Sequence, residues 1–321
     1  MAHREGNGRN GFSLLRGVEI LFLVCALVCL GFLIRGVSSD ARERASDRAM
    51  REQIQRLSQQ AGEAEEAAAE GKEARGFSFL NFGSALAEEI PIESISAAAV
   101  EDGGMDPSVA PMMEAAFAAG PDVVGILEAG NDIALYVPQG SDNDFYLTHD
   151  VAGKYSDAGA AFLDYRCQLD PRSTHLMIHG HNMRSGAIFG DLDKYRDAAY
   201  LAENSIVYWT TQYGREAYVP YAVAEISVST QDSQYFKMTI FDFDTDEMQE
   251  KFAFILKTKS DFELPVDVQG GDELLSLVTC SYGYDNGRLV LALRKVRDGE
   301  DVEALAQQIR DALENPDSFK A

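Results

Sequence analysis

From about residue 111 onwards, the chain is a succession of short apolar runs separated by turn residues. The runs are rich in β-branched and aromatic side chains, a composition typical of strands. They read DIALYVPQG, AAFLDYR, THLMIHGH, SIVYWTT, YAVAEISVS, LLSLVTC and RLVLALRKV. This part of the chain is therefore predicted to be a sheet protein.

Helical patterns in the same region are few. PMMEAAFAAG predicts a short helix that stops at Gly120-Pro121, and two more are AIFGDLDKYRDAAYLAEN and TDEMQEKFAFILKTK. A doubly wound parallel sheet needs a helix after nearly every strand, which this pattern does not supply. We therefore expect a mainly β barrel with peripheral helices over residues 111–300, followed by a C-terminal helix over 301–321.

The N-terminal region contains an apolar stretch from Ile20 to Ile34. Extended back to Phe12, it is long enough to cross a bilayer if Arg16 and Glu19 lie in the interface. We expect a cytoplasmic tail over residues 1–11 and a transmembrane signal anchor over 12–36. Arginines flank both sides, so charge does not set the orientation. A short polar N-terminus and a long C-terminal domain favour N-in, C-out topology, with the domain outside the cell.

Residues 37–76 are rich in Ala, Glu, Arg and Gln and contain no proline, which predicts an exposed helical stalk. A weak heptad seam runs through it, formed by Met50, Ile54, Leu57, Ala61, Ala64 and Ala68. The seam is short and ends in alanine, so a lone solvated helix is favoured over a coiled coil. Residues 77–110, rich in Gly, Ser, Ala and acidic residues, are interpreted as a linker.

The charge of the chain is concentrated in its C-terminal part. Residues 1–76 hold 11 basic and 11 acidic residues, so the net charge of −24 belongs to residues 77–321, with 17 against 41. Such an acidic body repels phosphate backbones, which excludes nucleic acid as an expected partner.

Cysteine is scarce. Cys25 and Cys29 lie in the predicted anchor, and Cys167 and Cys280 remain for the folded domain. Two cysteines are too few for a disulfide framework. A single disulfide between Cys167 and Cys280, or a role as buried structural thiols, remains an alternative.

The segment SLVTCSYGYDNGR places Cys280 at the end of one apolar run and Arg288 at the start of the next. His181 lies just past the end of an earlier run. A neighbouring cation lowers the pKa of a thiol, an imidazole can protonate a leaving amine, and a guanidinium can stabilise an oxyanion. The order His before Cys argues against papain-like peptidases.

The histidines permit a second interpretation. His175, His179 and His181 are separated by even numbers of residues, so in an extended strand their side chains would share one face. Together with Cys167 they therefore suggest a metal site. No tight Cys pair supports it, and Gly180 is expected to end the strand before His181. Gly180 can turn His181 towards the cysteine, whereas His149, His175 and His179 are interpreted as structural.

Taken together, these segments resemble the class B sortases. SLVTC is similar to the family's cysteine strand, with Ser276 in place of a threonine. IHGHNMRSGAIFGDLDKY resembles its histidine segment, and YDNGR its arginine. Upstream, PDVVGILEAGNDIALYVPQGSDNDFYLTHDVAGKYSDAGAAFLDYR follows the same family pattern. The resemblance spans roughly Pro121–Val296. It departs at Cys167-Gln168, where asparagine is common, and in the segment between EISVS and LLSLVTC.

The resemblance implies a closed eight-stranded sortase-type β-barrel, preceded by the transmembrane helix and stalk, that acts as a transpeptidase outside the cytoplasmic membrane. Cys280 would attack the threonine carbonyl of a C-terminal sorting signal on a secreted protein, assisted by His181 and Arg288. The thioester would pass to an amine of a peptidoglycan precursor or of a pilin. No metal or organic cofactor is expected.

Asn143 and Leu147, in DNDFYL, match the family's substrate-groove positions. Tyr235 and Thr279 are further candidates for substrate binding, and a plain strand role for Thr279 stays open. Two alternatives to the enzyme also stay open: a membrane-tethered metal-binding barrel and a catalytically inactive scaffold on the same fold. An intact Cys, His and Arg set argues against the scaffold.

Overall fold

The computed structural model describes residues 24–27, 30, 44–63, 104–281 and 286–315. The chain divides into two units, Met1–Ser46 and Asp47–Ala321. In the first, the described residues are helical and exposed. None of the helices within the described ranges is long and apolar enough to cross a membrane. The predicted tail, most of the anchor over 12–36 and most of the linker lie outside the described residues.

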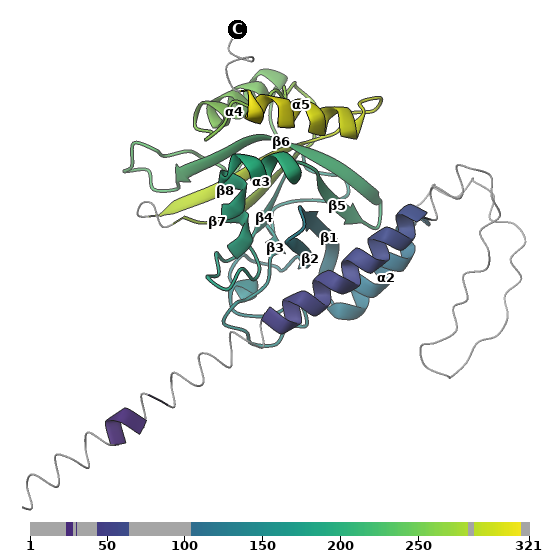
Figure 1. Cartoon of the computed structure of the whole chain (residues 1–321), viewed down its shortest axis with the longest axis vertical. Helices are drawn as coiled ribbons and strands as arrows, with labels where there is room; N and C mark the ends of the chain where they lie inside the picture. The colour runs from purple at the N-terminus through teal and green to yellow at the C-terminus, as the bar shows by residue number, and fades with distance from the viewer. Residues whose placement is uncertain (1–23, 28–29, 31–43, 64–103, 282–285, 316–321) are drawn as a thin grey trace, which may run out of the picture. The chain divides into compact units, whose positions relative to one another are not determined.

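The second unit is built around one eight-stranded sheet (Figure 1). Its spatial order is β2-β1-β5-β6-β8-β7-β4-β3, and only the β4–β7 ladder is parallel. The strands are β1 (Val123–Ala129), β2 (Ile133–Pro138), β3 (Phe162–Leu163), β4 (His175–His179), β5 (Val207–Thr211), β6 (Gly214–Ser227), β7 (Leu274–Cys280) and β8 (Gly287–Lys295). The predicted eight-stranded β architecture is confirmed.

The barrel is nearly closed, whereas the sequence predicted full closure. β2 and β3 are the two ends of the sheet order, and no ladder between them is found among the described strands. β3 is only two residues long, which leaves little backbone for pairing. The side chain of Gln139, just after β2, spans the gap by donating hydrogen bonds to the carbonyls of Asp164 (3.0 Å) and Cys167 (2.8 Å).

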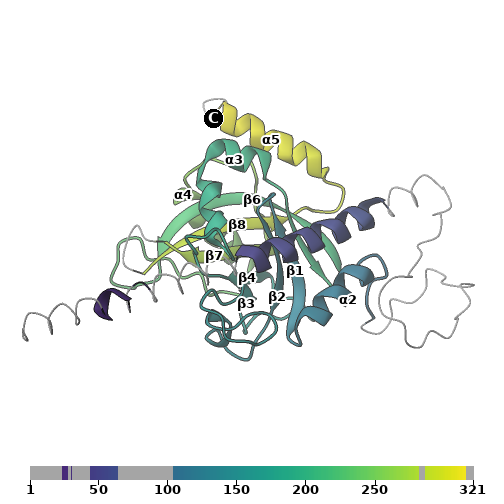
Figure 2. The same cartoon turned by 60° about the horizontal axis from the view of Figure 1, so that its bottom comes forward.

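Helices surround the sheet, as the sequence predicted. They are α2 (Ala110–Ala119), η1 (Phe145–Leu147), η2 (Gly190–Arg196), α3 (Ala198–Glu203), α4 (Asp246–Thr258) and α5 (Val302–Glu314), with η denoting 3₁₀ helices. α4 and α5 lie on the β6 side of the sheet (Figures 1 and 2). Thr245 caps α4 and Asp301 caps α5, each side chain accepting a backbone N–H of the first turn.

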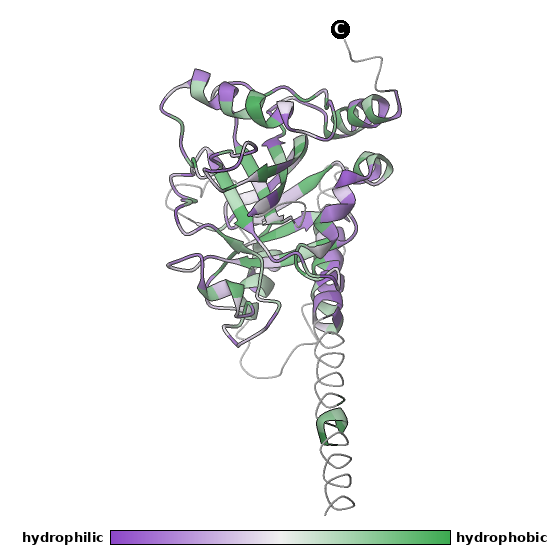
Figure 3. Cartoon of the chain, turned by 90° about the vertical axis from the view of Figure 1, so that its left-hand side faces the viewer, coloured by the Kyte–Doolittle hydropathy of each residue, from purple (hydrophilic) through white to green (hydrophobic). Residues whose placement is uncertain are grey.

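Residues 47–63, the part of a longer helix that belongs to this unit, pack against the barrel beside α2 (Figure 2). Most of this part is hydrophilic (Figure 3), but Ile54 is fully buried in a cluster with Val109, Met112 and Ile126. Met50, Leu57 and Ala61, from the predicted seam, pack on the same cluster. The expectation of a solvated stalk is therefore wrong for these residues, because the seam's narrow apolar stripe is buried by the barrel itself.

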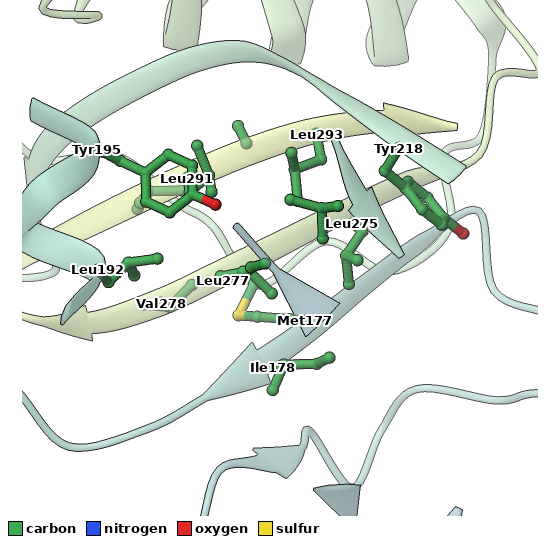
Figure 4. Close-up of a cluster of buried hydrophobic side chains, with 14 of the residues drawn as sticks. Met177, Ile178, Leu192, Tyr195, Tyr218, Leu275, Leu277, Val278, Leu291 and Leu293 are labelled. Atoms are coloured by element: carbon green, nitrogen blue, oxygen red, sulfur yellow. The ribbon is translucent and has the colours of Figure 1, made fainter. Parts of the chain in front are cut away.

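Figure 4 shows the part of the main core where side chains of β4, β7 and β8 meet those of η2 and β6. Leu277 on β7 pairs directly with Leu291 on β8, and Leu275 with Leu293. Ile178 on β4 is the parallel partner of Leu277. Sliding any of these strands by one residue would move its apolar side chains to the opposite face, so burial fixes the register.

Candidate active site

Cys280 is the last residue of β7, and its direct partner across the ladder is Arg288, near the start of β8. The backbone N–H of Ser281 donates to the carbonyl of Gly287 (3.0 Å), so the Cys280–Arg288 pair occupies the neighbouring non-hydrogen-bonded position. At such positions the Cα atoms are about 4.5 Å apart and the side chains share one face. The predicted thiol and guanidinium are therefore neighbours.

Among the described residues, neither side chain is paired with another charged group. Cys280 is a partly exposed free thiol. The Arg288 guanidinium donates to the carbonyl of Gly287 (2.8 Å), and no carboxylate within the described part of the chain forms an ion pair with it. Its other N–H donors can therefore serve an incoming oxygen atom.

His181 reaches the same end of the sheet through the parallel β4–β7 ladder. His179 pairs with Val278, and the N–H of Gly180 donates to the Val278 carbonyl (3.1 Å). Continued by two residues, this register brings His181 level with Cys280. The Asn182 side chain donates to the carbonyl of Cys280 (3.0 Å), which ties the two segments together.

The His181 ring is held by the loop that contains η1. Its Nε2 lies 2.8 Å from the carbonyl oxygen of Leu147. Since a carbonyl oxygen only accepts, Nε2 carries the proton and Nδ1 remains for proton exchange. Leu147, predicted to line a substrate groove, thus contacts His181 through its backbone.

Asp164, which follows β3, organises this loop. Its side chain is fully buried and accepts hydrogen bonds from Asn143 (2.8 Å), Arg166 (2.9 and 2.8 Å) and His179 (3.0 Å). Burial alone would raise the pKa of the Asp164 carboxyl, but these hydrogen bonds outweigh it and hold that pKa well below its ordinary value. Asp164 therefore remains an anion that joins β3, β4 and the η1 loop.

Asn143 is committed to the same network. Its amide nitrogen donates to Asp164, and its amide oxygen accepts the backbone N–H of Tyr165 (3.1 Å). The side chain predicted to bind substrate is thus occupied in holding the loop in place.

The two remaining predicted substrate residues differ in exposure. Thr279 is 1% exposed, and its hydroxyl donates to the carbonyl of Gly180 (2.8 Å), so it supports the site from within. Tyr235 is 39% exposed, and its backbone bridges to Ser227, the partner of Gly287. Tyr235 therefore lies at the Arg288 end of the barrel, where a bound peptide could reach it.

The other histidines have separate structural partners. His175 is fully buried between the Ile240 carbonyl (2.7 Å) and the Ser276 hydroxyl (2.8 Å), and burial lowers its pKa to about 4. His149 stacks on Phe145. No group of three His, Cys, Asp or Glu side chains suited to a metal was found in the described ranges. The metal-site alternative thus has no supporting geometry here.

Cys167 is also structural. It is buried and free, so it is not joined to Cys280 by a disulfide. Burial raises the pKa of its thiol to about 12, which suppresses the reactive thiolate.

Sequence reasoning missed Asp164 and Asn182. Both lie within segments that it quoted, FLDYR and HGHNM. Arg166, two residues on, is a local partner of Asp164, but the contacts that join segments, from Asn143 and His179 to Asp164 and from Asn182 to Cys280, come from distant parts of the chain and leave no local signal.

Comparison with known proteins places this arrangement in a family. The model of the sortase domain matches residues 135–296, about half of the chain. Sortase B of Listeria monocytogenes is 31% identical over 176 residues, covering 53% of this chain and 68% of the relative. Sortase B of Staphylococcus aureus is 24% identical over 192 residues, covering 59% and 76%. A solved Staphylococcus aureus sortase B–substrate complex is similar in fold, with a TM-score of 0.58 at 18% identity, covering 82% of this chain and 100% of that one.

Proposed function

Because the chain belongs to the sortase family of cysteine transpeptidases and is similar to its class B members, we propose that Cys280, His181 and Arg288 carry out its reaction. The observation that supports this most directly is the register that pairs Cys280 with Arg288. The hydrogen bond from the Asn182 side chain to the Cys280 carbonyl brings the segment that carries His181 next to this pair.

The first half of the proposed reaction forms a thioester. The sulfur of Cys280, as thiolate, attacks the threonine carbonyl carbon of a sorting signal, and the carbonyl oxygen becomes an oxyanion. Arg288 donates N–H groups to that oxygen and favours the thiolate by its charge. The thiol proton of Cys280 passes to Nδ1 of His181 when the thiolate forms, and His181 then gives that proton to the leaving amine as the C–N bond breaks. The products are an acyl-enzyme and the released C-terminal peptide.

The second half transfers the acyl group. An amine of a peptidoglycan precursor or a pilin attacks the thioester carbonyl, and His181 takes up the proton that the amine loses. The C–S bond breaks, a new amide forms and Cys280 is regenerated. Atoms and charge balance with the side chains alone, so this scheme requires no cofactor.

The residues that line the substrate groove are assigned from the exposure of side chains around the site. We assign Leu147 and Tyr235 to substrate contact, since both are partly exposed at the Cys280 end of the barrel. Asn143 and Thr279 support the groove without contacting substrate: Asn143 holds the η1 loop through Asp164, and Thr279 holds Gly180.

We further propose that residues 12–36 anchor the enzyme in the cytoplasmic membrane as a single pass, with the catalytic domain outside the cell. The apolar stretch Ile20–Ile34 supports this assignment. Protease added to intact protoplasts should remove the domain; protection of the domain would reverse this topology.

Acyl-enzyme formation tests the proposed chemistry. Peptides are taken from secreted proteins of the same genome that end in a signal, an apolar span and a basic tail. Mixed with the full chain, one of them should give a mass increase on the Cys280 peptide that is lost with hydroxylamine. Cys280→Ala should show none. If no such peptide acylates the wild-type chain, the inactive-scaffold alternative is favoured.

A further inference from the structure

The loop after His181 contains an unusual backbone conformation. Ile188 has φ of 55°, in the left-handed region. For a β-branched residue this is a genuine outlier, because its side chain crowds the backbone there. Such conformations persist only where surrounding contacts hold them, so the contacts of Ile188 are informative.

Ile188 is directly connected to the proposed active site. It forms an antiparallel bridge with Asn182, whose side chain donates to the Cys280 carbonyl. The next residue, Phe189, donates its N–H to the carbonyl of His181 (3.1 Å). The backbone at Ile188 thus sets the position of the segment that carries His181 and touches Cys280.

The Ile188 side chain is buried in the main core, and its backbone N–H is bound from outside the loop by the helix of residues 47–63. A carboxylate oxygen of Asp47 accepts the N–H of Ile188 at 3.2 Å, across 141 positions of sequence. One turn further along the helix, Arg51 lies 3.6 Å from Asp132, which also pairs with Lys194 of η2 (2.7 Å). The helix therefore contacts the loop at Ile188 and is linked to η2, which follows the loop, through the shared partner Asp132.

We propose that Asp47 is a positioning residue for the transpeptidation reaction: its carboxylate holds Ile188 in the left-handed conformation that places His181 and Asn182 against Cys280. The inference rests on the proposed function of His181 and Cys280. If Asp47 has this role, the helix that follows the predicted membrane anchor helps to position the active-site residues.

Three variants of the full chain test this role. Asp47→Ala removes the acceptor, whereas Asp47→Asn keeps an amide oxygen that can accept the same N–H. Glu52→Ala is the matched control, because Glu52 is exposed on the same helix and its side chain forms no hydrogen bond or ion pair within the described residues. Melting temperatures are measured for all three, and turnover is compared well below the lowest of them.

Asp47→Ala should lower kcat by about 10- to 100-fold, as expected for a small misplacement of reacting groups, while KM changes by less than about 2-fold. Asp47→Asn should retain most of the activity, and Glu52→Ala all of it. A wild-type kcat in Asp47→Ala, or equal losses in Asp47→Ala and Asp47→Asn, would overturn the proposal. A rise in KM at constant kcat would do so as well.

A second measurement separates this proposal from the proposed function. The rate at which iodoacetamide alkylates Cys280 is followed on its own peptide by mass spectrometry, over a range of pH. Asp47→Ala should change this pH profile, since it moves His181 relative to the thiol, and Asp47→Asn should restore it. If no peptide is turned over but the profile still depends on Asp47, the assigned reaction fails and the positioning role stands. An unchanged profile overturns the positioning role.

Discussion

Cys280 and Arg288 are direct partners at the end of the β7–β8 ladder, eight residues apart in sequence. The same ladder pairs Leu277 with Leu291 and Leu275 with Leu293 in the core. Because a one-residue slip would expose these leucines, the hydrophobic core fixes which residue faces the thiol. Core packing therefore determines the geometry of the reactive residues at the strand ends.

Replacing Arg288 by lysine should nearly abolish turnover. Lysine keeps the charge but lacks the planar fork that can bind an oxyanion beside the thiol. Losing an oxyanion donor costs about 10²- to 10³-fold in kcat. Steady-state kinetics on an acylating peptide measure the effect, with Arg310→Lys on α5 as a control expected to be active. Near-normal kcat in Arg288→Lys would remove the guanidinium from the mechanism.

His181→Gln and His179→Gln should have different consequences. His181→Gln should lower kcat by about 10²- to 10⁴-fold, the usual value of general acid catalysis. His179 contacts Asp164 and packs on Phe162, so His179→Gln should chiefly lower the melting temperature while leaving sizeable activity. Both variants are assayed on the same peptide. Equal losses of kcat would contradict the separation of roles.

Asp164→Asn should destabilise the fold and loosen the η1 loop. The substitution removes the buried anion that accepts hydrogen bonds from Arg166, His179 and Asn143. Arg166 is 38% exposed, so water compensates in part, and we expect a loss of about 1–3 kcal/mol in the free energy of unfolding. Denaturant titration measures it.

The pH dependence of the same variant provides a check. The pKa of Asp164 is lower in the folded protein than its ordinary value of 3.8. Its contribution to stability is therefore present above pH 3.8 and is lost as the pH falls below that value. The stability difference between wild type and Asp164→Asn should shrink on acidification. A difference that grows would contradict the assignment.

His175 should make the protein less stable in mild acid. Folding lowers its pKa from 6.5 to about 4, so the unfolded chain binds a proton between these values and the folded protein does not. Stability from this residue is complete above pH 6.5 and falls towards pH 4, by at most about 1.4 kcal/mol per pH unit. His175→Gln should have a shallower slope of unfolding free energy between pH 6.5 and 4.5. Parallel slopes would show that His175 does not titrate there.

Removing residues 1–76 should destabilise the catalytic domain. The deletion removes Ile54 and uncovers Met112, Met113 and Ile126. Burial of one large aliphatic side chain is worth about 1.5–3 kcal/mol, so a lower urea midpoint is expected. A fragment that begins at residue 40 keeps the helix and serves as the control. Equal midpoints would show that the helix does not contribute to the fold.

Local patterns in the sequence were sufficient for much of the molecule. Runs rich in β-branched and aromatic residues marked the strands, the segment TDEMQEKFAFILKTK marked α4, and Cys280 and Arg288 were placed at the end of one strand and the start of the next. The motifs around these residues also predicted the sortase family, which the comparisons confirmed. These features depend on neighbours within a few residues, so each leaves a signal in the segment that forms it.

Only the tertiary structure decided how distant segments meet. The parallel β4–β7 pairing brings His181 towards Cys280 across 99 residues, Asp164 joins three segments, and the helix of residues 47–63 contacts Ile188. The narrow apolar stripe of that helix predicted that it would be solvated, because the stripe alone does not identify the surface that buries it. Side-chain period reports which face of an element is buried, whereas the identity of the covering surface depends on the packing of the whole barrel.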